Sequence, residues 1–229
     1  TSGEIETEAV VLLDVQETKH ICDVVGLDDY TTVYLDTVVV TKKYDQYIFI
    51  QDKTGSMLIY DATNAKTGKP YGQGLKQGDV LTDVAGMYKN YYGVPELSPR
   101  QAWSVSKTPV EVQPTIVTEV DSADVCRYVR LEKVFIEDNM LTIGDKDIIV
   151  ADPFNTGIMP GVTTDLDAIV MWSWNQLELW VIGQRITTSV VSPSASHLPT
   201  GKCYNVLGQE VPSDYRGIII QDGCKQYVR

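Results

Sequence analysis

The sequence predicts an all-β protein made of two similar five-stranded units and a small C-terminal β-module. Strand-type segments rich in Val, Ile, Thr and Tyr fill most of the chain, whereas helical periodicity is scarce. The same order of five segments occurs twice, at 30–105 and at 116–188. A segment with two prolines, 106–115, and a Ser- and Pro-rich segment, 189–202, are typical of linkers and leave 203–229 as the third part.

The first unit contains five strand candidates after an acidic N-terminal segment, 1–29. Residues 46–52 alternate in polarity, and a Gly turn joins them to a similar run, which predicts a hairpin. Pro95 and Pro99 cannot donate ladder hydrogen bonds, so they must lie at the edge or end of the last strand. The expected strands lie within 30–40, 46–52, 56–62, 74–88 and 94–105.

The second unit repeats this order with different residues. Its last two strands are expected on either side of a short turn at Asn175-Gln176. The expected strands lie within 126–139, 140–147, 148–155 and 165–186, and the last range holds two of them. Five short strands in this order suit a small Greek-key barrel of the OB type. We therefore expect two tandem OB-like five-stranded barrels, followed by a short C-terminal β-hairpin module.

Several short motifs in the first unit make the OB expectation more specific. They are Ile50-Gln51-Asp52, Thr54-Gly55, Leu75 with Gly78-Asp79, Gly86, and Tyr92-Gly93 with Pro95-Glu96-Leu97. This pattern resembles OB-fold domains in secreted and surface proteins of Bacteroidetes-type bacteria, and it covers about 44–100. The final segment, CYNVLGQEVPSDYRGIIIQDGCKQYVR, is similar to the C-terminal sorting tails of secreted proteins in the same bacteria. These resemblances imply a protein that is secreted, periplasmic or located at the cell surface.

The C-terminal segment also predicts a disulfide. Cys203 and Cys224 flank two strand candidates, 204–211 and 217–223, which a turn at 212–214 would fold onto each other. This closure would bring the cysteines together, and a small exported module often needs such a covalent link. The alternative is a pair of reduced thiols.

Aromatic residues gather on one expected face of the first unit. Side chains alternate along a strand, so Tyr47 and Phe49 share one face while Ile48 and Ile50 fill the interior. OB folds bind extended polymers on such a face and at the loops on its rim. The predicted ligand-binding residues are Tyr34, Tyr47, Phe49, Tyr60, Tyr88, Lys89, Tyr91 and Tyr92. The alternative is structural packing, because Tyr favours strands and residues 1–29 could cover this face.

Three tryptophans surround the expected turn of the second unit. Alternation places Trp172 and Trp174 on one face, and Trp180 follows the turn. They form either a platform for a carbohydrate or a protein partner, or an interface between the two units.

Charge and motif spacing narrow the function classes. The net charge is −12; residues 1–29 and 106–190 each carry −7, whereas 30–105 carry +1, which places a glycan slightly ahead of a single-stranded nucleic acid. His20 and His197 are isolated, the cysteines lack metal-site spacing, and no phosphate-loop motif occurs. We expect no membrane span, metal, cofactor or catalytic residue. The hypotheses are a non-enzymatic binding module for a glycan or single-stranded nucleic acid, and a structural or adhesion module that contacts protein.

Overall fold

The computed structural model describes residues 16–62, 68–187 and, in the C-terminal part, 203–205, 208–212, 216–221 and 224–228. Residues 1–15 of the acidic segment and the predicted linker 189–202 lie outside this description. The chain divides into two compact units, Thr1–Thr187 and Thr188–Arg229. Strands dominate both units, as the sequence predicts, and one short helix, α1 (Ile21–Val24), precedes the first sheet. In the described part of the chain, no helix has the length and apolar character to cross a membrane.

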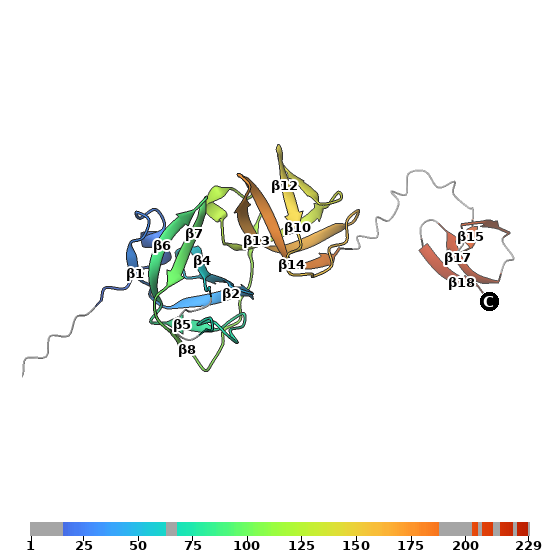
Figure 1. Ribbon diagram of the computed structural model, residues 1–229. Helices are drawn as coiled ribbons and strands as arrows, with labels where there is room; N and C mark the ends of the chain where they lie inside the picture. Colours follow the sequence, from blue (N-terminus) through green and yellow to red (C-terminus); the bar gives the residue numbers. More distant parts are fainter. Residues whose placement is uncertain are drawn as a thin grey trace, which may run out of the picture. The chain divides into compact units, whose positions relative to one another are not determined.

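The first sheet has eight strands in the order β1-β6-β7-β4-β3-β2-β5-β8 (Figure 1). The expected first strand is divided into β1 and β2. The expected fourth strand is divided into β5 and β6, because Asp83 between them adopts a left-handed φ of 62°. β4 and β7 pair in parallel, and the other neighbours pair antiparallel. The strands are β1 (Thr32–Tyr34), β2 (Val38–Tyr44), β3 (Tyr47–Gln51), β4 (Ser56–Tyr60), β5 (Val80–Thr82), β6 (Ala85–Tyr91), β7 (Val94–Pro99) and β8 (Ser104–Val105).

The second sheet has six strands in the order β11-β12-β14-β13-β10-β9. β12 and β14 pair in parallel, just as β4 and β7 do in the first sheet. The third and fifth core strands are therefore neighbours in both sheets, which agrees with the predicted repeat. The strands are β9 (Thr115–Val117), β10 (Tyr128–Phe135), β11 (Met140–Ile143), β12 (Lys146–Ala151), β13 (Thr163–Ser173) and β14 (Gln176–Ile186).

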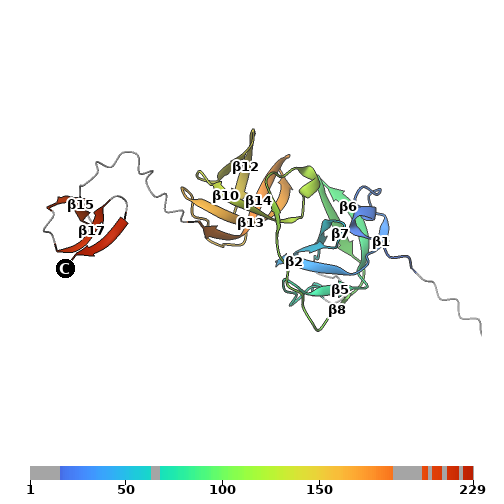
Figure 2. The same cartoon turned by 180° about the vertical axis from the view of Figure 1, so that it is seen from behind.

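Neither sheet closes into a barrel, whereas the sequence predicts two tandem OB-like five-stranded barrels. In the first sheet β5 pairs with β2 and β6 pairs with β1, and the break near Asp83 separates these two pieces (Figures 1 and 2). In the second sheet, β10 and β11 are not neighbours in the strand order, and an isolated bridge links Glu137, after β10, to Met140 at the start of β11. The left-handed backbone conformations of Lys133 and Asp138 interrupt the regular strand geometry in this region.

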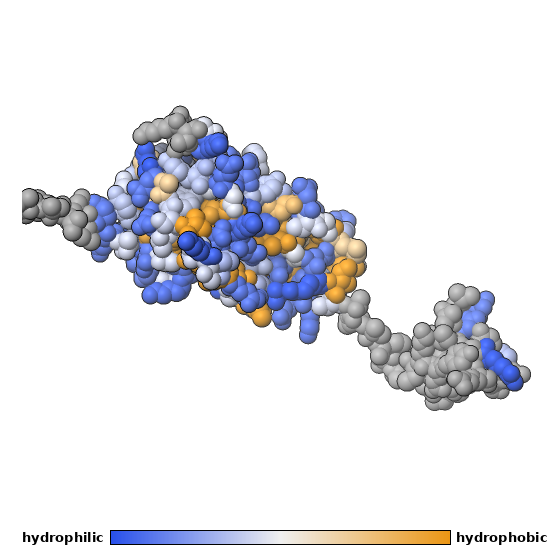
Figure 3. Space-filling view, turned by 90° about the horizontal axis from the view of Figure 1, so that it is seen from below, coloured by the Kyte–Doolittle hydropathy of each residue, from blue (hydrophilic) through white to orange (hydrophobic). Residues whose placement is uncertain are grey.

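Each of the two sheets within Thr1–Thr187 encloses its own apolar core. Ile48 and Ile50 are fully buried in the first core, as alternation predicts, and α1 adds Ile21 and Val24. The second core contains residues from β10 to β14, among them Val129. Apolar residues also lie on the surface as separate patches among hydrophilic ones (Figure 3).

A third apolar cluster joins the two sheets to each other. Its buried members come from β3, β4 and β7 of the first sheet and from β10, β13 and the segment before β10 in the second. They are Phe49, Leu58, Val94, Val125, Cys126, Tyr128, Ile169 and Met171. A shared buried cluster of this size fixes the two sheets as one body.

The C-terminal unit is a four-stranded sheet rather than the predicted two-stranded hairpin. Its order is β16-β15-β17-β18, formed by β15 (Cys203–Asn205), β16 (Glu210–Val211), β17 (Gly217–Gln221) and β18 (Cys224–Val228). The expected strand 204–211 is divided between β15 and β16, which pair with each other.

The register of this sheet does not fit the predicted disulfide between Cys203 and Cys224. Both residues lie opposite Gln221, on the two sides of β17. Two strand spacings put their backbones about 10 Å apart, whereas a disulfide needs roughly 4.4–6.8 Å between Cα atoms. Cys203 is a free thiol, and the side chain of Cys224 lies outside the described residues.

Candidate ligand-binding surface

The predicted aromatic face of β3 is covered. Phe49 has no exposed surface, and its ring lies 6.1 Å from that of Trp180, nearly perpendicular to it. The ring of Tyr47 makes the same edge contact with Trp180 at 6.0 Å. In these ring contacts the cover comes from Trp180 of the second sheet. The structure therefore places Phe49 and Trp180 in an interface, which leaves Phe49 closed to a ligand.

Tyr60 continues this interface at its margin. Its ring lies 5.8 Å from that of Tyr47, at an interplanar angle of 66°. Burial raises the pKa of Tyr60, and the neighbouring Tyr47 and Glu96 raise it further. Tyr60 is half-buried, and its ring packs against Tyr47.

Two other residues that were predicted to bind ligand, Tyr88 and Tyr34, do not belong to an exposed aromatic surface. Tyr88 is fully buried in the first core, and its hydroxyl oxygen accepts a hydrogen bond from the backbone N–H of Gly26 at 3.0 Å. Tyr88 was predicted to bind ligand, but it lies within β6 and its ring is closed to solvent. Tyr34 is half-buried in β1, where it pairs with Ala85.

Phe154 belongs to the same interface, although sequence reasoning did not single it out. Its ring lies 6.0 Å from that of Trp180 and 5.1 Å from that of Tyr44. Lys42 places its Nζ 4.6 Å from the centre of the Phe154 ring, and burial lowers the pKa of this lysine. Lys42 therefore serves the packing between the sheets. The signal in the sequence was a lone aromatic residue in the Asp-Pro-Phe loop after β12.

The remaining predicted aromatic residues lie at the tips of two hairpins. β6 and β7 are joined by Tyr92-Gly93, with φ angles of 51° and 95°, and β13 and β14 by Trp174-Asn175, with φ angles of 50° and 64°. Two-residue turns with both φ angles positive are of type I′, which favours Asn and Gly. Here Tyr92 and Trp174 hold the first positions of the two turns instead. Tyr92 is 82% exposed and Trp174 is 92% exposed.

The two hairpin tips approach each other closely. A Cβ atom placed on Gly93 would lie 2.6 Å from Cδ1 of Trp172, so the indole occupies the space that a side chain would need. The rings of Tyr91 and Tyr92 lie 4.9 Å apart. We name Tyr91, Tyr92, Trp172 and Trp174 the tip cluster. It combines Tyr91 and Tyr92, predicted to bind ligand on the first sheet, with two of the predicted tryptophans, Trp172 and Trp174, of the second sheet.

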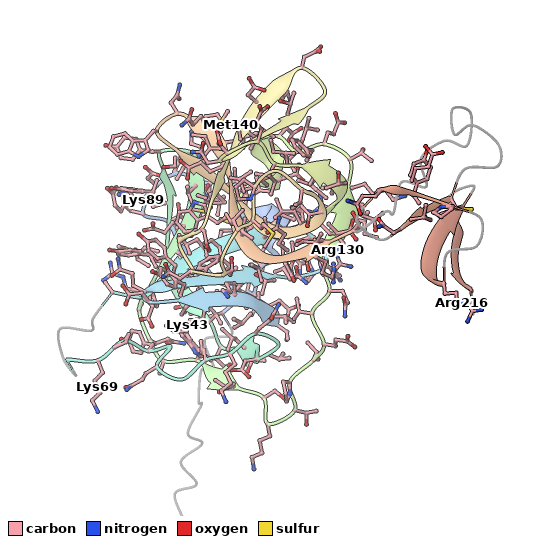
Figure 4. All side chains as sticks on the ribbon, turned by 90° about the vertical axis from the view of Figure 1, so that its right-hand side faces the viewer. Lys43, Lys69, Lys89, Arg130, Met140 and Arg216 are labelled. Atoms are coloured by element: carbon pink, nitrogen blue, oxygen red, sulfur yellow. The ribbon has the colours of Figure 1, made fainter. Side chains whose placement is uncertain are left out.

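Three charged residues, Lys89, Glu96 and Asp29, lie beside the tip cluster. Lys89, at the margin of the first sheet (Figure 4), places its Nζ 4.3 Å from the centre of the Tyr91 ring. Glu96 lies opposite Lys89 in the ladder and is 8% exposed. Burial raises the pKa of Glu96, while Lys89 opposes this effect. The backbone N–H of Asn90 donates a 2.7 Å hydrogen bond to Asp29.

Comparisons with known proteins add little to this geometry. No family model and no curated protein matches the chain. Among solved structures, the crystal structure of the p204 HINb domain aligns with 70% of this chain and 100% of its own length, at 14% identity and a TM-score of 0.30. A likeness this weak supports no conclusion about the function of this protein.

Proposed function

We propose that the protein is an exported, non-enzymatic binding module, built from two OB-like sheets, which holds an extended ligand at exposed aromatic residues. The ligand is a glycan or a single-stranded nucleic acid. The parallel pairing of the third and fifth strands in both sheets supports the OB-like assignment. Export is supported by the similarity of residues 203–229 to sorting tails.

One observation carries the binding proposal: Tyr92 is 82% exposed in a left-handed turn position. Such a conformation costs about 1–3 kcal/mol for a residue other than Gly, and Asn would relieve part of that cost. Burial gives nothing in return, since the ring lies in solvent. Strained residues of this kind are concentrated at ligand-binding sites.

The predicted alternative, a structural role for the aromatic face, is favoured for β3 by a different observation. Phe49 is fully buried against Trp180. We propose that this face serves packing between the sheets, and that binding is confined to the outer rings, with Lys89 beside Tyr91.

Arrays of neutral glycans and of single-stranded oligonucleotides, probed with the whole protein, test the binding proposal. We expect at least one class to bind, and Tyr92→Ala to weaken that binding. Phe135→Ala is the matched control, because Phe135 is a 53% exposed ring at the end of β10, where it pairs with Thr163, the first residue of β13, whereas the turn at Trp174 follows the last residue of β13. The absence of binding, or equal loss in both variants, would overturn the proposal.

A further inference from the structure

We infer that the binding surface is composite: the hairpin tips of both sheets form one platform, and this platform takes an uncharged glycan strand. The inference rests on the proposed binding function and adds two statements to it. The second sheet contributes Trp174 directly to ligand contact, and the ligand class is neutral sugar rather than nucleic acid.

The contact between Gly93 and Trp172 places the two tips side by side. Gly93 directly follows Tyr92, and Trp172 lies two residues before Trp174. Neighbouring residues in a strand are about 3.3 Å apart, so the exposed rings start from backbone positions within a few residue lengths of the contact. Any side chain on Gly93 would force the indole of Trp172 away.

Buried residues directly behind the tips hold them in place. Val94, which follows the first turn, is 6% exposed, and Met171, which precedes Trp172, is 5% exposed. Both belong to the apolar cluster between the sheets. The backbone N–H of Gly93 also donates a 2.8 Å hydrogen bond to Oδ1 of Asn90. A platform fixed in this way loses little conformational entropy when a ligand binds.

The charges around the tips favour an uncharged ligand. Lys89 already contacts the ring of Tyr91 and lies opposite Glu96. The carboxylate of Asp29 accepts a hydrogen bond from the N–H of Asn90, and Glu178 accepts one from Nε1 of Trp180 at 3.0 Å. Nucleic-acid affinity depends on neutralising phosphates with free cations, in a chain that here carries −12. Neutral sugars instead offer C–H faces to the rings and hydroxyl groups to polar atoms at the rim.

Titration of Trp174→Ala, Tyr92→Ala and the double variant with the neutral glucans that bind on the array tests the inference. We expect each single variant to lose about five- to 150-fold in affinity, the range for one ring that stacks on a ligand. We also expect Gly93→Ala to weaken binding, because it displaces Trp172. Single-stranded oligo(dT) should bind none of these proteins. Near-ultraviolet circular dichroism confirms that each variant is folded.

The outcomes separate the inference from the proposed function. If Tyr92→Ala loses binding and Trp174→Ala does not, the composite surface is wrong while the binding function stands. If oligo(dT) binds and glucans do not, the ligand class is wrong. If neither class binds the unmodified protein, the proposed function fails, and the inference fails with it.

Discussion

Glu96 is a buried carboxyl group on β7, in hairpin β6–β7. Burial raises its pKa above the ordinary value of about 4.3, and Lys89 offsets this only in part. For an acid with a raised folded-state pKa, the folded protein holds the proton more tightly than the unfolded chain. The stability gained is therefore complete below pH 4.3 and declines as pH rises through the folded-state pKa.

The variant Glu96→Gln tests this linkage. We expect the unmodified protein to lose stability as pH rises above the ordinary glutamate pKa of about 4.3, and the variant to lose less, because glutamine does not ionise. Urea unfolding at a series of pH values measures the difference. Exposed Glu119 supplies the control: Glu119→Gln should keep the slope of the unmodified protein. Identical slopes in all three proteins would contradict the linkage.

The hairpin β6–β7 carries a turn whose sequence is not the best for its backbone. Type I′ turns favour Asn-Gly, and here the first position is Tyr92. We expect Tyr92→Asn to stabilise the protein by about 0.5–1 kcal/mol, since Asn tolerates a left-handed φ, and at the same time to weaken ligand binding. Tyr92→Ala removes the ring without improving the turn. Thermal unfolding and glycan titration of both variants give the two readouts, and a Tyr92→Asn protein that is no more stable than Tyr92→Ala would refute the strain argument.

The elements themselves were mostly predictable from local sequence. Alternation in β3 correctly put Ile48 and Ile50 inside, and the turn at the end of β13 was displaced by one residue. Tyr88 was predicted to bind ligand but is buried, because the direction of its side chain depends on the pairing of β6 with β1 and β7, which the local pattern does not encode. The polarity pattern of β3 also could not show that a second sheet lies on Phe49, because that contact joins residues more than a hundred positions apart.

At the scale of the whole compact unit Thr1–Thr187, the aromatic interface between the two sheets determines whether the sheets unfold together. Trp180 contacts Tyr47, Phe49 and Phe154. Trp180→Ala should destabilise the protein by less than the about 3–5 kcal/mol that a fully buried large aromatic residue costs, because Trp180 is half-buried, and should separate one unfolding transition into two. Urea unfolding measures the loss of stability and the number of transitions. Proteolysis within segment 106–115, between the two sheets, then shows whether they unfold separately. The matched tryptophan variant Trp174→Ala should leave the single transition intact, because that ring is 92% exposed. A single, unshifted transition for Trp180→Ala would show that the sheets are held together by other contacts.

The parallel pairs β4–β7 and β12–β14 have a consequence for how the chain folds. Leu58 pairs with Glu96, 38 residues later, and Ile149 pairs with Glu178, 29 residues later. Hairpins such as β3–β4 form from neighbouring residues within microseconds, whereas these pairs must first close a long loop. We therefore expect the hairpins to form early and each parallel pair to form late, which makes folding slower than in a helical protein of the same length. During synthesis, the first sheet cannot form its parallel pair β4–β7 until β7 has left the ribosome.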